Sequence, residues 1–229
     1  MRDSRASSTP LAAWAIFVDF DGTITDLDTF DVLVRHFAGN EAWLRTEVGL
    51  DAGTMSLRDV LSLQASYVRG SFEDVAALLR AEVTVDPTFA PFVADARAHD
   101  IPVTVLSSGI APIIRDRLVR VGLGDLAIVA NDIDPAPTGW TIAFRDPVGN
   151  GTDKAGIVRA ARDAGTRTLF IGDGRSDYAA AVVADRCFAK RGLPLERYLR
   201  EHDVPFESFE TFDEIALDSI IANTFARTE

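Results

Sequence analysis

The chain has 229 residues, of which 47% are hydrophobic and 25% are charged, as in globular proteins with one domain and an insertion or with two small domains. This composition excludes a disordered tail, a collagen-like fibre and a disulfide scaffold, and a single cysteine cannot form an intramolecular disulfide. Asp and Glu number 35 against 23 Lys and Arg, and the net charge of −12 disfavours nucleic acid and anionic membranes as partners.

The first predicted element is a short buried strand over residues 14–18, which runs directly into carboxylates. The early apolar stretch, residues 11–18, is too short to cross a membrane and has no cleavage site, so we expect a cytoplasmic protein. From residue 25 to residue 85, apolar residues recur at three- and four-residue steps, which predicts an all-helical module inserted after the first strand. Ser56 and Ser71 are its predicted helix N-caps.

Strands and helices alternate in the rest of the chain, residues 86–229, which with residues 14–24 forms the predicted core. We expect strands at residues 101–106, 126–130, 140–144 and 168–171, and helices at residues 86–99, 112–121, 153–164 and 177–184. This alternation predicts an α/β fold with a mainly parallel sheet.

Polar residues follow three of the predicted strands: Asp19 and Asp21 the first, Ser107 and Ser108 the second, and Asp173 the third. In an open α/β sheet, ligands bind beyond the carboxyl ends of the strands. We therefore expect these residues, although they are spread over about 150 positions, to meet at one edge of the sheet under the helical module.

Two carboxylates two residues apart, in the segment Asp-Phe-Asp-Gly-Thr at residues 19–23, predict a nucleophile and a general acid/base that act on one phosphoryl group. The alternative is a polar turn that ends the strand, since Asp and Gly are common turn residues. A chance match to such a pattern is rare, on the order of one in a thousand chains, so the catalytic interpretation is favoured.

Ser107, Ser108 and Lys154 are candidate phosphate-binding residues. A hydroxyl and exposed N–H groups at a strand end can hold phosphate oxygens, and an ammonium can act as a point charge on a phosphate. Lys154 begins a predicted helix after the glycine-rich loop at residues 149–151, in a chain that has only two lysines. The alternatives are an ordinary loop and a solvated surface lysine, and Lys190 is predicted to be of the second kind.

Asp173 and Asp177 lie four residues apart at a predicted strand-to-helix turn. Together with Asp19 they predict a magnesium site, because hard cations prefer oxygen ligands and Mg²⁺ needs few protein carboxylates beside water and substrate phosphate. The alternative is a tight turn with Asp177 as a helix cap.

These elements resemble the four motifs of the haloacid dehalogenase superfamily of phosphatases, in the right order over residues 14–184. The resemblance implies a Rossmann-like core, and an inserted helical cap is similar to the phosphoserine phosphatase subgroup. It also implies a two-step reaction in which Asp19 attacks phosphorus to form an aspartyl-phosphate. Asp21 protonates the leaving oxygen and then deprotonates the water that hydrolyses the intermediate.

The same resemblance implies the ligands of Mg²⁺, namely the carboxylates of Asp19 and Asp173 and the main-chain carbonyl of Asp21, with Asp177 in support. Ser107, the Ser108 N–H and Lys154 would then surround the transferred phosphoryl group.

Substrate choice is expected to depend on the cap. Asp28 matches a position where phosphoserine phosphatases carry a Glu that meets the substrate amine, or else it is an N-cap. Their cap arginine aligns with Val60 here, although Arg58 could substitute for it. The segments at residues 185–189 and 205–209 resemble the methionine-salvage branch, which acts on 2-hydroxy-3-keto-5-methylthiopentenyl-1-phosphate.

We therefore expect a magnesium-dependent phosphomonoester hydrolase of a small phosphorylated metabolite, most similar to the methionine-salvage phosphatases. The main alternative is a phosphoserine phosphatase. A phosphomutase and a non-catalytic homologue that binds a phosphorylated ligand are less favoured. The sequence makes no prediction of oligomeric state.

Overall fold

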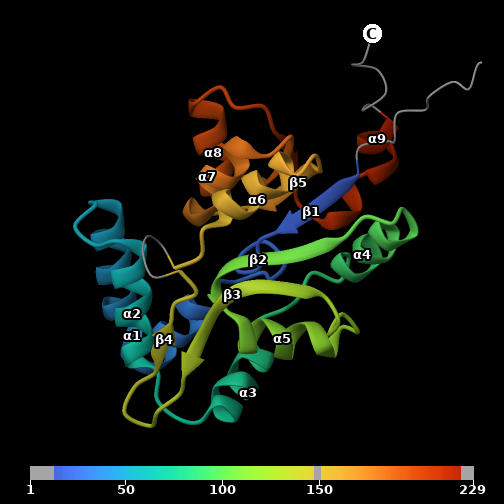
Figure 1. Cartoon of the computed structure of the whole chain (residues 1–229). Helices are drawn as coiled ribbons and strands as arrows, with labels where there is room; N and C mark the ends of the chain where they lie inside the picture. Colours follow the sequence, from blue (N-terminus) through green and yellow to red (C-terminus); the bar gives the residue numbers. More distant parts are fainter. Residues whose placement is uncertain (1–12, 147–150, 223–229) are drawn as a thin grey trace, which may run out of the picture.

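The computed structural model describes residues 13–146 and 151–222, and its centre is a seven-stranded sheet in the order β4-β3-β2-β1-β5-β6-β7 (Figure 1). β4 is antiparallel to β3, and the other neighbouring pairs are parallel. The strands are β1 (Trp14–Val18), β2 (Val103–Ile110), β3 (Ala127–Asp134), β4 (Thr141–Ala143), β5 (Arg167–Gly172), β6 (Arg186–Lys190) and β7 (Glu207–Phe209). This arrangement confirms the predicted α/β fold.

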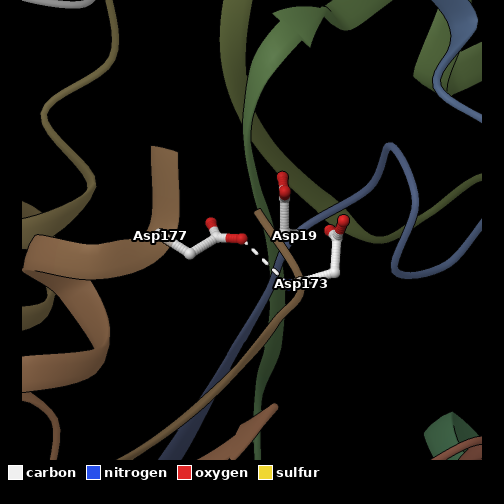
Figure 2. A group of neighbouring side chains, drawn as sticks. All are labelled: Asp19, Asp173 and Asp177. Atoms are coloured by element: carbon white, nitrogen blue, oxygen red, sulfur yellow. Dashed lines mark hydrogen bonds between the residues drawn. The ribbon is translucent and has the colours of Figure 1, made fainter. Parts of the chain in front are cut away.

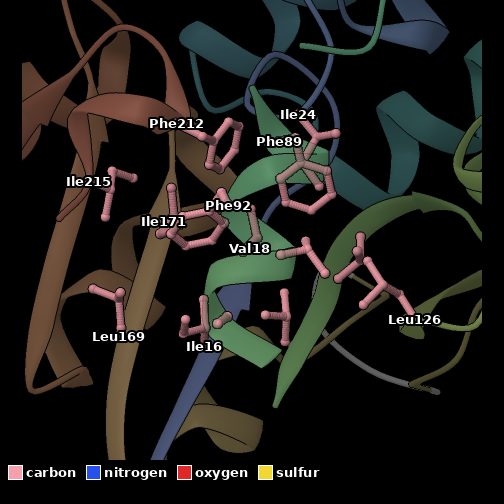
Figure 3. Packing of buried hydrophobic residues seen from close by; sticks show 14 of the residues in the cluster. Ile16, Val18, Ile24, Phe89, Phe92, Leu126, Leu169, Ile171, Phe212 and Ile215 are labelled. Atoms are coloured by element: carbon pink, nitrogen blue, oxygen red, sulfur yellow. The ribbon is translucent and has the colours of Figure 1, made fainter. Parts of the chain in front are cut away.

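Helices cover both faces of the sheet. They are α1 (Thr29–Asp51), α2 (Leu57–Tyr67), α3 (Phe72–Glu82), α4 (Phe89–Ala98), α5 (Ala111–Arg120), α6 (Lys154–Asp163), α7 (Tyr178–Val183), α8 (Pro194–Glu201) and α9 (Leu217–Ala222), with 3-10 turns at Arg175–Asp177 and Phe212–Glu214. Successive side chains of β1 pack on opposite faces of the sheet, because side chains alternate along a strand. Ile16 and Val18 pack with α4, α5 and α9, whereas Phe17 packs with α6, α7 and α8. Figure 3 shows the first of these layers, in which Phe89 and Phe92 of α4 and Phe212 lie over the strands.

Three helices, α1, α2 and α3, follow β1 and form what we call the helical insertion. It has a hydrophobic cluster of its own, which also takes in Trp140 and Ile142 from the β3–β4 hairpin. Its two ends are joined by a β-bridge between Thr25 and Val85. These bridge partners are the boundaries that the sequence suggested, although the division of the chain into a core and a cap stays a prediction.

Local sequence signals explain the starts of these helices. Ser56 and Ser71 form capping boxes with Asp59 and Asp74, which satisfies backbone N–H groups that have no partner within the helix. α1 is not one continuous helix, because Gly39 at φ +81° interrupts it. Positive φ is accessible to glycine without steric cost, so the break falls where the sequence permits it.

Some expectations need correction. β2 runs to Ile110, past the expected end at residue 106, with an irregular register against β3 between Leu106 and Ile110. The serines at residues 107 and 108 therefore belong to the strand itself. Lys190 is not a solvated surface residue: its ammonium is half-buried, donates to the Thr23 carbonyl at 2.9 Å and lies 5.8 Å from the Phe209 ring. Part of the loop at residues 149–151 lies outside the described residues.

In the described part of the chain, no helix combines the length and the apolar character needed to cross a membrane.

Candidate active site

The carboxyl end of β1 lies level with the middle of β2 and with the end of β5, because Val18 is the register partner of both Val105 and Ile171. At this edge of the sheet is a cavity of about 280 Å³, lined on the other side by residues of α1 and α2. Its lining residues are Asp19, Asp21, Asp28, Phe30, Asp31, Glu47, Leu50, Leu57, Val60, Leu61, Gln64, Ser107, Ser108, Gly109, Asp173, Gly174, Arg175, Ser176 and Pro194. The structure thus brings together predicted site residues from three separate strands.

Lys154 is buried between two carboxylates. Its ammonium lies 2.8 Å from Oδ1 of Asp19 and 2.7 Å from Oδ1 of Asp177, and it donates to the Ser176 hydroxyl at 3.0 Å. Lys154, Asp19 and Asp177 are 2%, 5% and 0% exposed. A buried ion pair of this kind persists only where each charge has a partner, so the lysine fixes the position of Asp19.

The pKa values of Lys154 and Asp19 are both shifted by burial and by the charges around them. Burial alone would lower the pKa of Lys154, but the carboxylates of Asp177 and Asp19 raise it above its ordinary value. Burial raises the pKa of Asp19 well above the usual range, and the charges of Asp177 and Asp173 add to that rise while Lys154 opposes it. One ammonium therefore does not neutralise the carboxylates around it.

Asp21 is held by the first residue of α1. Its Oδ1 accepts hydrogen bonds from the backbone N–H of Thr29 at 2.9 Å and from the Thr29 hydroxyl at 2.6 Å. A Cβ at Gly109 would lie 2.5 Å from Oδ2 of Asp21, so glycine is required there for the close approach of β2. Burial raises the pKa of Asp21, and the hydrogen bonds from Thr29 oppose the rise. A carboxyl group that holds a proton more readily than usual suits a general acid.

Asp173 faces Asp19 from the end of β5. Its Oδ1 accepts a hydrogen bond of 2.6 Å from the Thr23 hydroxyl, whereas its Oδ2 lies where a Cβ at Gly22 would come within 2.6 Å. Burial, followed by repulsion from Asp177, raises the pKa of Asp173 to about 7.

Carboxylate oxygens of Asp19, Asp173 and Asp177 lie within 4.8 Å of one another (Figure 2). Both carboxylate oxygens of Asp177 already have partners in the protein. Its Oδ1 pairs with Lys154, and its Oδ2 accepts hydrogen bonds from the backbone N–H groups of Asp173 and Gly174, each at 3.0 Å. Asp19 and Asp173 keep oxygens directed to the cavity. Hard oxygen donors with an excess of negative charge fit Mg²⁺, with Asp177 as the residue that orients the others.

The two serines of β2 differ. The Ser107 hydroxyl accepts a hydrogen bond from the Gly109 N–H at 2.9 Å, which orders the backbone beside Asp21. Ser108 is 8% exposed, and its hydroxyl has no hydrogen-bond partner among the described residues. A buried hydroxyl without a partner is costly, so its position at the cavity indicates a ligand group that it meets.

The two predicted cap residues lie in different places. Asp28 lines the cavity and is also the N-cap of α1, since its Oδ1 accepts from the N–H groups of Phe30 and Asp31. Arg58 is not among the lining residues. Its guanidinium lies 4.0 Å from the centre of the Phe144 ring and donates to the Asp146 carbonyl. The structure therefore brings Asp28, but not Arg58, to the predicted site.

The family model of haloacid dehalogenase-like hydrolases matches residues 16–181 of the chain. The chain belongs to this family. The matched segment contains both catalytic candidates, the buried lysine and the acidic turn after β5, and it includes the whole helical insertion.

Relatives in this family that cover most of the chain include several phosphatases. Pdp3-interacting factor 1 of Schizosaccharomyces pombe is 34% identical, over 89% of this chain and 93% of its own length. Polyol phosphate phosphatase PYP1 of Saccharomyces cerevisiae is 33% identical, over 87% and 90%. A 2-hydroxy-3-keto-5-methylthiopentenyl-1-phosphate phosphatase of Brevibacillus brevis is 30% identical, over 87% and 92%.

Solved structures agree with the fold. A phospho-aspartyl intermediate analogue of phosphoserine phosphatase superimposes with a TM-score of 0.67 at 18% identity, over 93% of this chain and 99% of that chain. The expected superfamily is confirmed, and the chain is a phosphatase of the haloacid dehalogenase-like family.

Sequence reasoning missed several residues of the site. Thr23 and Thr29 hold Asp173 and Asp21, and Ser176 accepts from Lys154. Thr23 and Ser176 stand inside the recognised motifs, so their position was a usable signal. Asp31 and Glu47 line the cavity from α1, and the sequence pattern distinguished neither from an ordinary solvated helix residue.

Proposed function

We propose that the protein hydrolyses small phosphomonoesters in a Mg²⁺-dependent reaction through an aspartyl-phosphate on Asp19. The observation that carries the proposal is the position of Asp19 at the cavity, 2.8 Å from the ammonium of Lys154 and within 4.8 Å of carboxylate oxygens of Asp173 and Asp177. A carboxylate fixed by an ion pair at a cavity wall is oriented before the substrate arrives, which lowers the cost of reaching the transition state.

In the first step, an Asp19 carboxylate oxygen forms a bond to phosphorus while the bond to the leaving oxygen breaks. Asp21, whose pKa is raised by burial, donates its proton to that leaving oxygen. In the second step, the resulting Asp21 carboxylate removes a proton from water, which attacks phosphorus and releases phosphate from Asp19. Thr29 keeps Asp21 oriented in both steps.

Lys154 and the serines of β2 are proposed to hold the phosphoryl oxygens, Lys154 by charge and Ser107 and Ser108 by hydrogen bonds. Mg²⁺, when held by the carboxylates of Asp19 and Asp173 and the carbonyl of Asp21, would supply the positive charge that lets an anionic substrate approach a carboxylate. Asp177 keeps Lys154 and the loop after β5 in place.

Two substrate classes are proposed, from the relatives named above: a substrate of the methionine-salvage type, and polyol phosphates. Neither named substrate carries a carboxylate. Phosphoserine is less favoured, because its carboxylate calls for a cation on the helical insertion and Arg58 does not line the cavity. A phosphomutase or a non-catalytic homologue would release no free phosphate from any of these substrates.

The test is p-nitrophenyl phosphate hydrolysis with Mg²⁺ and with EDTA, on the native chain, Asp19→Asn and the control Asp163→Asn. We expect metal-dependent activity, its loss in Asp19→Asn, and full activity in Asp163→Asn, which changes an exposed carboxylate at the end of α6. Acid quenching during turnover should trap phosphate on the native chain. Full activity of Asp19→Asn would contradict the proposal.

A further inference from the structure

The cavity has a sheet end, formed by residues at β1, β2 and β5, and an opposite end formed by the helical insertion. The two ends differ in the charges that they carry. Among the described residues that line it, six are acidic and one, Arg175, is basic. The acidic residues at the sheet end, Asp19, Asp21 and Asp173, are the predicted Mg²⁺ ligands, and Asp19 also pairs with Lys154. The charged residues that the helical insertion contributes, Asp28, Asp31 and Glu47, are all acidic. A leaving group bound at this end therefore meets carboxylates and no cation from the helical insertion.

The break in α1 at Gly39 allows acidic residues from both halves of the helix to line the same cavity. Asp31 comes before the break and Glu47 after it, yet both line the same cavity. They are close enough to influence each other: burial raises the pKa of Glu47, and the charge of Asp31 adds to the rise. The carboxylate of Glu47 forms no hydrogen bond or ion pair with any other described residue.

The nearby arginines do not change the balance. Arg175 lines the cavity from the sheet end and forms an ion pair with Asp51 at the end of α1, so its guanidinium is engaged by a carboxylate of the protein. Arg35 stacks on the ring of Trp43 at 3.8 Å and is not among the residues that line the cavity. Both oppose the rise in pKa of neighbouring carboxylates, but neither offers the cavity a free guanidinium.

A second anion on the leaving group would lose water and meet mainly carboxylates here, whereas hydroxyl groups can donate hydrogen bonds to those carboxylates. Apart from Gln64, the rest of this wall is apolar, formed by Phe30, Leu50, Leu57, Val60 and Leu61, and suits a carbon chain. We propose that Asp31 and Glu47 are specificity-determining residues, which select phosphomonoesters of uncharged hydroxylated alcohols and reject those whose leaving group carries a carboxylate. This inference rests on the proposed phosphatase function.

The test compares two substrates of one skeleton, glycerol 3-phosphate and 3-phosphoglycerate, which differ in a terminal CH₂OH or carboxylate. The native chain should prefer glycerol 3-phosphate by at least about 100-fold in kcat/KM. Asp31→Asn and Glu47→Gln should each reduce this preference by about 10-fold, mainly through a lower KM for 3-phosphoglycerate. Glu41→Gln, an exposed position of α1 whose side chain is 93% exposed, is the matched control and should change nothing.

Two further substrates make the result decisive. p-Nitrophenyl phosphate has neither group, so each chain's kcat/KM for the two substrates is expressed relative to its own kcat/KM for p-nitrophenyl phosphate, which Glu41→Gln should leave unchanged. If the native chain does not hydrolyse it with Mg²⁺, the proposed function fails, and this inference with it. If it is hydrolysed but the two variants leave the substrate preference unchanged, the inference alone is overturned. A higher kcat/KM for 2-aminoethyl phosphate than for glycerol 3-phosphate would also overturn it, in favour of an ammonium-binding wall.

Discussion

The two ends of the cavity are built on different principles. At the sheet end, each carboxylate has a partner within the protein: Asp19 has Lys154, Asp21 has Thr29 and Asp173 has Thr23. At the end formed by the helical insertion, Glu47 has none among the described residues. Groups that must react are therefore fixed before the substrate binds, whereas Glu47 at the other end keeps its hydrogen-bonding capacity for the leaving group.

The largest effect is expected from removing the charge that fixes the sheet end. Lys154→Met leaves the buried carboxylates of Asp19 and Asp177 unpaired, which should lower the free energy of unfolding by about 3–5 kcal/mol and abolish activity. Denaturant unfolding and p-nitrophenyl phosphate hydrolysis measure the two effects. Lys190→Met is the matched control: it removes one hydrogen bond to the Thr23 carbonyl and should cost about 1 kcal/mol. Equal losses in the two variants would contradict the central place given to Lys154.

An intermediate effect is expected from loosening one partner at that end. The Thr29 hydroxyl donates a hydrogen bond to Asp21, and this hydrogen bond favours the ionised form of Asp21. Thr29→Val removes it. Without it, the pKa of Asp21 rises, and the protonated acid persists to higher pH. The alkaline limb of the pH profile of kcat/KM should therefore move upward. Thr54→Val, which removes a hydroxyl bonded to the Gly49 carbonyl, should leave the profile in place. A downward shift in Thr29→Val would show that Asp21 is not the group titrated.

The smallest effect is expected where the two ends meet. Arg175, beside Asp173, pairs with Asp51 of α1, and the side chains of the pair are 45% and 57% exposed. Exposed ion pairs contribute little, so Asp51→Asn should lower the free energy of unfolding by about 1 kcal/mol or less and change kcat/KM only a few-fold. Asp125→Asn breaks a comparable exposed pair with Arg97, remote from the cavity, and is the control. A collapse of activity in Asp51→Asn alone would mean that this contact orders the site.

The sheet end of the site could be predicted from the sequence because its residues are tied to strand ends. A buried strand followed by polar residues fixes the place of Asp19 and Asp173, whatever the intervening chain does, whereas Ser107 reaches the same cavity from within β2. The lysines show the limit of this reasoning. Lys154 stands beside a motif, but Lys190 had no such neighbour, and its contact with the Thr23 carbonyl spans 167 positions.

The wall formed by the helical insertion could not be predicted in the same way. Helical periodicity shows that a face is apolar, but not which polar residues of the other faces turn toward a cavity. The break at Gly39 reorients the second half of α1, so spacing along the sequence does not relate Asp31 to Glu47. Arg58 illustrates the opposite case: alignment put Val60 at the position of the cap arginine and Arg58 was a candidate substitute, but its side chain lies over Phe144 and does not line the cavity.

The bridge between Thr25 and Val85 has a consequence for how such proteins diversify. The two crossings of the chain are as close together as neighbouring strands of a hairpin, with the N–H of Asp86 bonded to the Ile24 carbonyl at 2.8 Å. A segment whose ends already lie together can be lengthened, shortened or exchanged without displacing the sheet that it interrupts. Substrate specificity can thus change in evolution through the inserted segment, while the reacting groups on the sheet stay the same.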